Sequence, residues 1–266
     1  MHPVFSAPWG ALHAVTLIAA MTMTMAPLAA TAQVKVLISG GFSGPYEQLV
    51  PEFERSTGLQ VATASGSSQG KGPQTIASQL ARGVPTDVVI LSREGLSELI
   101  AAGRIAAGTD VDLAQTPLGL AVRAGAPKPD VRTVEAFKLL MAQARSVSVP
   151  SSTSGIFLMQ DVFPRLGLPV ANVRATPRGA EAAALVASGA ADFAVMPVSE
   201  IVHAPGVELA GVLAEEIQLH QVFAAAVVAG STQPDAAKRL IAFLASDRAA
   251  AAIRQGGMEP VGRARP

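Results

Sequence analysis

Short apolar runs alternate with amphipathic stretches along most of this chain. The runs have the length of buried β-strands, and the stretches between them repeat apolar residues three and four positions apart, as one face of an α-helix does. This alternation is typical of βαβ units and a mainly parallel sheet. The strands predicted in this way are Val34–Ile38, Leu59–Ala64, Asp87–Leu91, Leu118–Val122, Ser146–Val149, Asp192–Met196 and Val222–Val228. The predicted helices are Pro45–Ser56, Pro73–Arg82, Glu94–Ala102, Val134–Ala144, Gly155–Leu166, Gly179–Ser188 and Pro234–Ile253.

The order of these elements predicts two lobes. Leu118–Val122 is interpreted as the strand that carries the chain into a second lobe, and Val222–Val228 as the strand that returns it. We therefore expect 33–118 in lobe 1, 119–221 in lobe 2, and 222–266 back in lobe 1 with a C-terminal helix. The predicted fold class is α/β, with mixed, mostly parallel sheets flanked by helices and two crossover strands.

The first 32 residues have the character of a secretory signal peptide. Ala11–Leu28 is uncharged and apolar, and Ala30-Thr31-Ala32 is a small-x-small pattern that suits cleavage before Gln33. The leader lacks the Lys or Arg that usually precedes such a segment, so an uncleaved N-terminal anchor is the alternative. We expect cleavage near Ala32 and export to the periplasm.

Composition narrows the classes of function. The 20 Lys and Arg balance the 20 Asp and Glu, which argues against nucleic acid or an anionic membrane as a partner. The chain has no Cys, which excludes disulfides, thiolate metal sites and Cys nucleophiles. Outside the leader only His203 and His220 remain, without metal-ligand spacing, so neither a metal nor another cofactor is expected.

Three predicted strand ends lead into small polar turns that open helices. They are Gly40–Ser43, Ser65–Ser68 and Ser151–Gly155. Helix N-termini offer unpaired N–H groups and a partial positive charge, and hydroxyls add donors, so together the turns favour an anion site at the carboxyl ends of the strands. The candidate ligand residues are Ser43, Ser67, Ser68 and Ser154. Ordinary N-capping is the alternative for each serine.

Arg178 is the candidate charge, because it precedes the helix Gly179–Ser188 and its guanidinium can form a fork with a carboxylate. A solvated arginine is the alternative. Lys71 lies in the glycine-rich segment after Ser68 and is interpreted as exposed, with closure over the site as the alternative. The acidic stretch Asp110–Asp112 is interpreted as a solvated loop.

Several of these segments resemble the periplasmic molybdate-binding proteins of ABC transporters. The resemblance rests on Val34–Ser43, Phe53–Gly58, Ser65–Ser68 and Gly83–Val89, and it extends over essentially the whole mature chain. It implies a type II periplasmic binding protein, with a ligand cleft between two α/β lobes.

The resemblance also implies ligand positions, and several of them differ in this chain. The family's first serine falls on Gly41, with Ser43 two residues on, and its tyrosine falls near Met196. A backbone donor falls near Pro177, which has no N–H. These departures favour a larger ligand with a carboxylate over molybdate, with Phe42 and Met196 as apolar walls.

The prediction is therefore a monomeric periplasmic substrate-binding protein that captures a small anion, an organic carboxylate or a molybdate-like oxyanion. It would deliver the anion to an inner-membrane ABC permease and would not be an enzyme. One alternative is an exported hydrolase or isomerase on the same scaffold, using a serine with His203 or His220. The other is a periplasmic ligand sensor.

Overall fold

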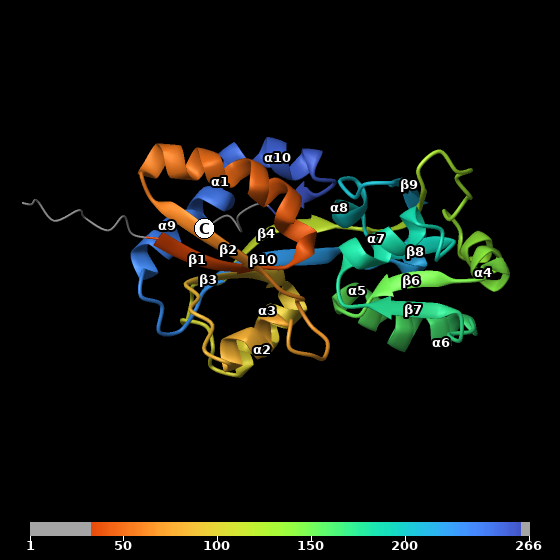
Figure 1. Ribbon diagram of the computed structural model, residues 1–266, viewed down its shortest axis with the longest axis horizontal. Helices are drawn as coiled ribbons and strands as arrows, with labels where there is room; N and C mark the ends of the chain where they lie inside the picture. The colour runs from red at the N-terminus through yellow and green to blue at the C-terminus, as the bar shows by residue number, and fades with distance from the viewer. Residues whose placement is uncertain (1–32, 262–266) are drawn as a thin grey trace, which may run out of the picture. The chain divides into compact units, whose positions relative to one another are not determined.

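A computed structural model describes residues 33–261, which belong to one compact unit. The strands form two sheets, each with helices on both faces (Figure 1). The six-stranded sheet has the order β11-β4-β10-β3-β1-β2 and the five-stranded sheet the order β7-β6-β8-β5-β9. We call the first sheet and its helices lobe 1, and the second sheet and its helices lobe 2.

The strands are β1 Gln33–Ile38, β2 Gln60–Ser65, β3 Val88–Ser92, β4 Val111–Thr116, β5 Leu118–Arg123, β6 Val147–Pro150, β7 Val173–Thr176, β8 Phe193–Pro197, β9 Val207–Val212, β10 Gln221–Val227 and β11 Glu259–Pro260. The α-helices are α1 Ser43–Thr57, α2 Ile76–Ala81, α3 Arg93–Ala101, α4 Val134–Gln143, α5 Thr153–Phe157, α6 Phe163–Leu166, α7 Gly179–Ala187, α8 Val198–Ile201, α9 Pro234–Leu244 and α10 Ala250–Gln255. The 3-10 helices are Gly40–Phe42, Glu215–Ile217 and Asp247–Ala249, and Leu158–Val162 is a π-helical turn between α5 and α6. None of the helices in this range has the length and apolarity needed to span a membrane.

The central strands read as continuous apolar runs because both of their faces are covered. Along β1, Val34 and Val36 pack under α1 and α9, whereas Leu37 faces the opposite core with residues of α2 and α3. Lobe 2 repeats this arrangement: α4 and the segment from α5 to α6 cover one face, and α7 and α8 cover the other. The predicted two-lobed α/β class with mixed sheets is therefore confirmed.

Parallel pairing is confined to β1 with its neighbours β2 and β3, and to β6 with its neighbours β7 and β8. The remaining pairs, which involve β4, β5, β9, β10 and β11, are antiparallel, so the sheets are mixed as predicted but not mostly parallel. The crossover strands thus enter each sheet against the direction of its parallel core.

The chain passes between the lobes at Pro117 and again along 213–220. Gln218 joins the two passages: its Oε1 accepts from the N–H of Leu118 at 2.6 Å, and its Nε2 donates to the carbonyl of Leu118 at 3.2 Å. Leu118, expected in lobe 1, begins a strand of lobe 2, and Gln221, expected in lobe 2, begins a strand of lobe 1.

The prediction that Asp110–Asp112 forms a solvated loop is wrong. Asp112 lies in β4, and Asp110 directly precedes that strand. Arg93 donates to both: Nε–Asp112 Oδ1 is 2.7 Å and Nη1–Asp110 Oδ2 is 2.8 Å. Both carboxylates stay partly exposed while they pair with Arg93, and burial along β4 does not alternate, so the sequence pattern gave no sign of a strand.

Other differences concern short or interrupted elements. The strands β7, β9 and β11 and the helix α8 were not predicted. The expected helix Gly155–Leu166 contains the π-helical turn, and the expected helix Pro234–Ile253 is interrupted after Leu244. At the C-terminal end of α9, Ser246 Oγ donates to the carbonyl of Phe243 at 2.7 Å.

Candidate functional site

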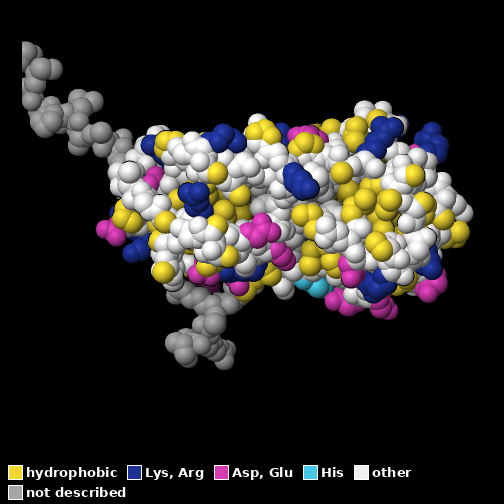
Figure 2. Space-filling model, turned by 90° about the horizontal axis from the view of Figure 1, so that it is seen from below, with side chains coloured by type: hydrophobic (Ala, Val, Ile, Leu, Met, Phe, Trp, Pro, Cys, Tyr) yellow, Lys and Arg dark blue, Asp and Glu magenta, His cyan; other side chains and the backbone are white. Residues whose placement is uncertain are grey.

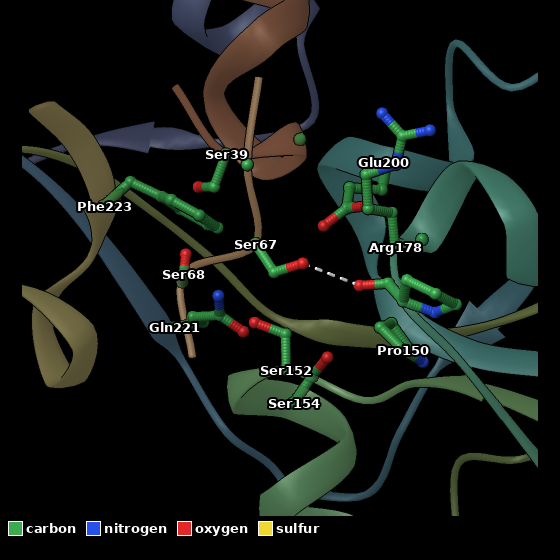
Figure 3. A pocket seen from close by; sticks show the side chains of 14 residues that line it. Ser39, Ser67, Ser68, Pro150, Ser152, Ser154, Arg178, Glu200, Gln221 and Phe223 are labelled. Carbon is green, nitrogen blue, oxygen red and sulfur yellow. Dashed lines mark hydrogen bonds between the residues drawn. The ribbon is translucent and has the colours of Figure 1, made fainter. Parts of the chain in front are cut away.

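A pocket lies where the carboxyl ends of strands from both lobes meet. Lobe 1 contributes the turn after β1, the segment after β2 and the start of β10, and lobe 2 contributes the turns after β6 and β7 and the helix α8. The cavity is small, about 20 Å³ for the centres of water molecules, which is room for about one water. Its lining residues are Ser39, Gly40, Gly66, Ser67, Ser68, Pro150, Ser152, Ser154, Pro177, Arg178, Gly179, Glu200, Gln221 and Phe223 (Figure 3).

Hydrogen bonds across the pocket join the two lobes directly. Ser67 Oγ donates to the carbonyl of Pro177 at 2.9 Å, as the dashed line in Figure 3 shows. The N–H of Gln69 donates to Ser152 Oγ at 3.2 Å. Thr153 Oγ1 donates to Gln69 Oε1 at 2.8 Å and lies 2.7 Å from Ser92 Oγ, which is buried in lobe 1. The structure is therefore a closed form, and a ligand larger than a water molecule enters only if these contacts open.

Two buried polar atoms of the pocket lining have no hydrogen-bond partner within the described chain. They are Ser39 Oγ and Gln221 Oε1, and their residues are only 4% and 3% exposed. Burying a polar group without a partner costs about 1–3 kcal/mol. A polar ligand that formed hydrogen bonds with these two atoms would offset that cost.

The pocket also contains one carboxyl group, that of Glu200. It lies on α8, just after β8, and accepts a hydrogen bond from the backbone N–H of Gly179. Desolvation raises the pKa of Glu200 from 4.5 to about 7, although the hydrogen bond acts in the opposite direction. Near neutral pH this group is therefore present both as the acid and as the carboxylate.

Two glycines from opposite lobes leave room for this carboxyl group. A Cβ placed on Gly179 would lie 1.8 Å from Glu200 Oε2, and one on Gly40 would lie 3.0 Å from the same oxygen. Neither glycine has a positive φ, so their value at these positions is space and not backbone freedom.

Arg178 lies at the rim of the pocket. Its Nε donates to Glu181 Oε1 at 3.1 Å, and its Nη1 is 3.4 Å from Ser65 Oγ. The side chain is 47% exposed, and Figure 3 shows the guanidinium pointing away from Ser152 and Ser154. Its Nη2 makes no hydrogen bond within the described residues and is available to a ligand at the rim.

Residues 34–259 match the family described as bacterial extracellular solute-binding proteins. This chain belongs to that family. The aconitate isomerase of Pseudomonas sp. is 37% identical to it over 248 residues, which cover 91% of this chain and 94% of that protein.

Solved structures of related solute-binding proteins show the same fold. The sulfate-binding protein SubI from Mycobacterium tuberculosis superposes with a TM-score of 0.70 at 22% identity, over 88% of each chain. The periplasmic molybdate-binding protein of Azotobacter vinelandii gives 0.63 at 19% identity, over 85% of this chain and 98% of that one. The resemblance to molybdate-binding-like proteins is thus confirmed for this solute-binding protein.

Four of the residues predicted from the sequence line the pocket: Ser67, Ser68, Ser154 and Arg178. Ser43 does not line it. Ser43 begins α1, and its Oγ donates to the carbonyl of Gly40 at 2.7 Å. The turn after β1 presents Ser39 and Gly40 instead.

The two predicted apolar walls are also placed elsewhere in this solute-binding protein. Phe42 is fully buried in the core of lobe 1, and Met196 is fully buried in lobe 2, with its Cε beneath Gly179. The aromatic ring in the lining is that of Phe223, against which Gly41 packs so closely that a Cβ there would lie 1.9 Å from Cζ.

The histidines are outside the pocket lining. Both are exposed, and His220 Nε2 lies 3.0 Å from Glu215 Oε1. The serine-histidine pair considered for a hydrolase is therefore not assembled in this pocket. Lys71 is exposed and likewise absent from the lining. Residues 33–261 contain no cluster of three or more His, Asp or Glu side chains able to hold a metal ion.

Four lining residues were not predicted from the sequence: Ser39, Glu200, Gln221 and Phe223. One signal was available: Gln221 directly precedes the predicted apolar strand Val222–Val228, and Glu200 follows the predicted strand Asp192–Met196 within four residues. That signal is weak, because polar residues flank most strands.

Proposed function

We propose that this protein binds a small polycarboxylate between its lobes and isomerises it by moving a proton, with aconitate as the leading substrate. The name of the 37% identical relative supports this substrate and reaction. The observation that carries the proposal is Glu200. A carboxyl group facing a captured anion would repel it as a carboxylate, whereas a group with a pKa of about 7 suits proton transfer near neutral pH.

The remaining pocket residues suit the carboxylates of such a substrate. Ser67, Ser68, Ser152 and Ser154 bring hydroxyl groups from both lobes to the pocket. Gln221 adds an amide whose oxygen lacks a partner, and amide orientation follows from the ligand that is bound. Arg178 supplies a positive charge at the mouth. Neutral donors and one arginine hold several carboxylates without a metal.

Capture for an ABC importer is the second candidate function, and membership of the solute-binding family favours it. In this case the protein would be exported to the periplasm and would deliver the anion to an inner-membrane permease. Closure of the lobes over the ligand, through contacts such as that between Ser67 and Pro177, would present the loaded form. The overall balance of charge is compatible with a free periplasmic protein, and Figure 2 shows both signs interspersed over the visible face.

Binding and turnover separate these candidates. The purified protein is titrated by calorimetry with cis-aconitate, trans-aconitate, tricarballylate, molybdate and sulfate, and each aconitate isomer is then followed by proton NMR. We expect binding of the tricarboxylates and interconversion of the two aconitates. Binding without interconversion would support capture only, and binding of molybdate or sulfate alone would refute a polycarboxylate site.

Arg178→Ala tests the charge at the mouth. We expect the affinity for a tricarboxylate to fall about tenfold, as for loss of one hydrogen bond to a charged group at a partly exposed site. Calorimetry measures the change. Arg174→Ala on β7 is the matched control, because Arg174 is exposed and does not line the pocket. Equal affinities of the two variants would show that Arg178 does not contact the ligand.

A further inference from the structure

We propose that Glu200 is the catalytic acid–base residue of this pocket and moves a single proton between two carbons of the bound tricarboxylate. This inference rests on the proposed function and names the residue that performs it. It follows from the position of the carboxyl group, from the slot that holds it, and from the absence of another proton carrier in the lining.

The slot is built from both lobes. Glu200 Oε2 lies where a side chain on Gly179 would be, and it is also close to Gly40 of lobe 1. The N–H of Gly179, at the start of the nine-residue helix α7, donates to the carboxyl group and orients it. The carboxyl group is therefore held between the two lobes and faces the cavity, which a ligand has to widen when it enters.

The lining offers no competing base of comparable strength. Glu200 is the only Asp or Glu among the lining residues of the described chain, and no His or Lys is among them. The serine hydroxyls bond to neighbours across the pocket or face the cavity, and no histidine is placed to activate them. A proton taken from carbon in this pocket therefore goes to Glu200.

The chemistry balances without an oxidant, a reductant or a further reactant. Aconitate carries a methylene group between one carboxylate and a carbon–carbon double bond. The Glu200 carboxylate removes a methylene proton, and the electron pair of that C–H bond forms a new double bond to the central carbon. The old π pair moves to the far alkene carbon, which takes the proton back from Glu200. One C–H bond breaks and one forms, and the new double bond can have either geometry.

The hydroxyl groups of the pocket support the intermediate stage. When the proton is on Glu200, negative charge spreads over the three allylic carbons and into the adjoining carboxylates. Ser68 of lobe 1 and Ser152 and Ser154 of lobe 2 line the pocket, and none of their hydroxyls donates to another group of the described chain. They can donate to that charge, which is how preorganised dipoles lower a barrier. The pKa of about 7 lets Glu200 act as base and as acid in one cycle.

The test combines binding, turnover and isotope exchange in D₂O. Wild type, Glu200→Gln and the control Glu47→Gln are compared with cis-aconitate, since Glu47 is exposed on α1. We expect Glu200→Gln to bind the substrate within about threefold of wild type and to slow both isomerisation and deuterium uptake into the methylene by about 10²–10⁴-fold. Glu47→Gln is expected to match wild type in all three measurements.

A second variant keeps the inference testable if Glu200→Gln folds poorly. Gly179→Ala adds a methyl group that must displace the carboxyl group, so turnover should fall while Glu200 is retained, and adding Glu200→Gln should cause no further loss. Turnover by Glu200→Gln at the wild-type rate would overturn the inference. Wild-type binding without turnover or exchange would also overturn it but leave the polycarboxylate site intact, whereas failure of wild type to bind any polycarboxylate would refute the function itself.

Discussion

Glu200→Gln is expected to be more stable than wild type by about 3 kcal/mol above pH 7 and to match it below about pH 4.5. In the unfolded chain the carboxyl group has its ordinary pKa of 4.5, and in the folded protein desolvation raises the pKa to about 7. Between these two values the folded state keeps a proton that the unfolded state has lost. Wild-type stability therefore falls as pH rises through this window, by about 1.4 kcal/mol for each pH unit.

Urea unfolding at pH 4.5, 6 and 8 measures this difference. Glutamine has the shape of the protonated acid and its oxygen can accept from the N–H of Gly179, so the variant avoids the cost of a desolvated charge. Glu47→Gln is the control and should show no such pH-dependent difference. A constant difference between Glu200→Gln and wild type at all three values would contradict the raised pKa. Replacing a functional residue often stabilises a protein, because the active site holds that residue in an environment that is unfavourable for folding.

Phe137→Ala is expected to destabilise the protein by about 3–5 kcal/mol, which is the usual cost of removing a fully buried aromatic ring. Phe137 lies on α4 with none of its surface exposed, in the lobe 2 core that includes Val147 and Phe163. Neighbouring side chains could fill the space left by the ring only if the sheet that includes β6 moved. Urea unfolding followed by circular dichroism measures the loss.

Leu139→Ala on the same helix is the matched control, because Leu139 is 61% exposed. Its effect should stay within about 0.5 kcal/mol. Phe137→Leu keeps most of the side-chain volume, and its loss of unfolding free energy should lie between those of Phe137→Ala and Leu139→Ala. If Phe137→Ala were as stable as Leu139→Ala, the packing assigned to α4 would be wrong.

The regular elements could be predicted well where a local pattern carries them. Val88–Leu91 is apolar throughout because it is buried on both faces, and α1 has an apolar face that includes Tyr46, Leu49 and Phe53. The elements that were missed, such as β9, carry no comparable signal because their residues are mostly half-buried. The pairing of β9 depends on β5, which is far away in sequence.

The candidate site was predicted only in part. Ser67, Ser68 and Ser154 follow strands directly, and the carboxyl ends of parallel strands meet at one edge of a sheet, so their convergence can be expected from the chain. The direction in which a side chain points from a tight turn cannot be predicted in this way. Phe42 and Ser43 follow Gly41, and their side chains turn into the core and onto the backbone of Gly40, respectively.

The sequence by itself determined the alternation of strands and helices, the two-lobed class and the serine-rich turns, because each of these depends on residues close together in the chain. Only the tertiary structure decided that Glu200, Gln221 and Phe223 join those turns, since their elements come together through the two passages between lobes. It also decided the acidity of Glu200. That property arises from the surrounding protein, which excludes water from the carboxyl group, and from two glycines 139 positions apart, Gly40 and Gly179, that leave space for it.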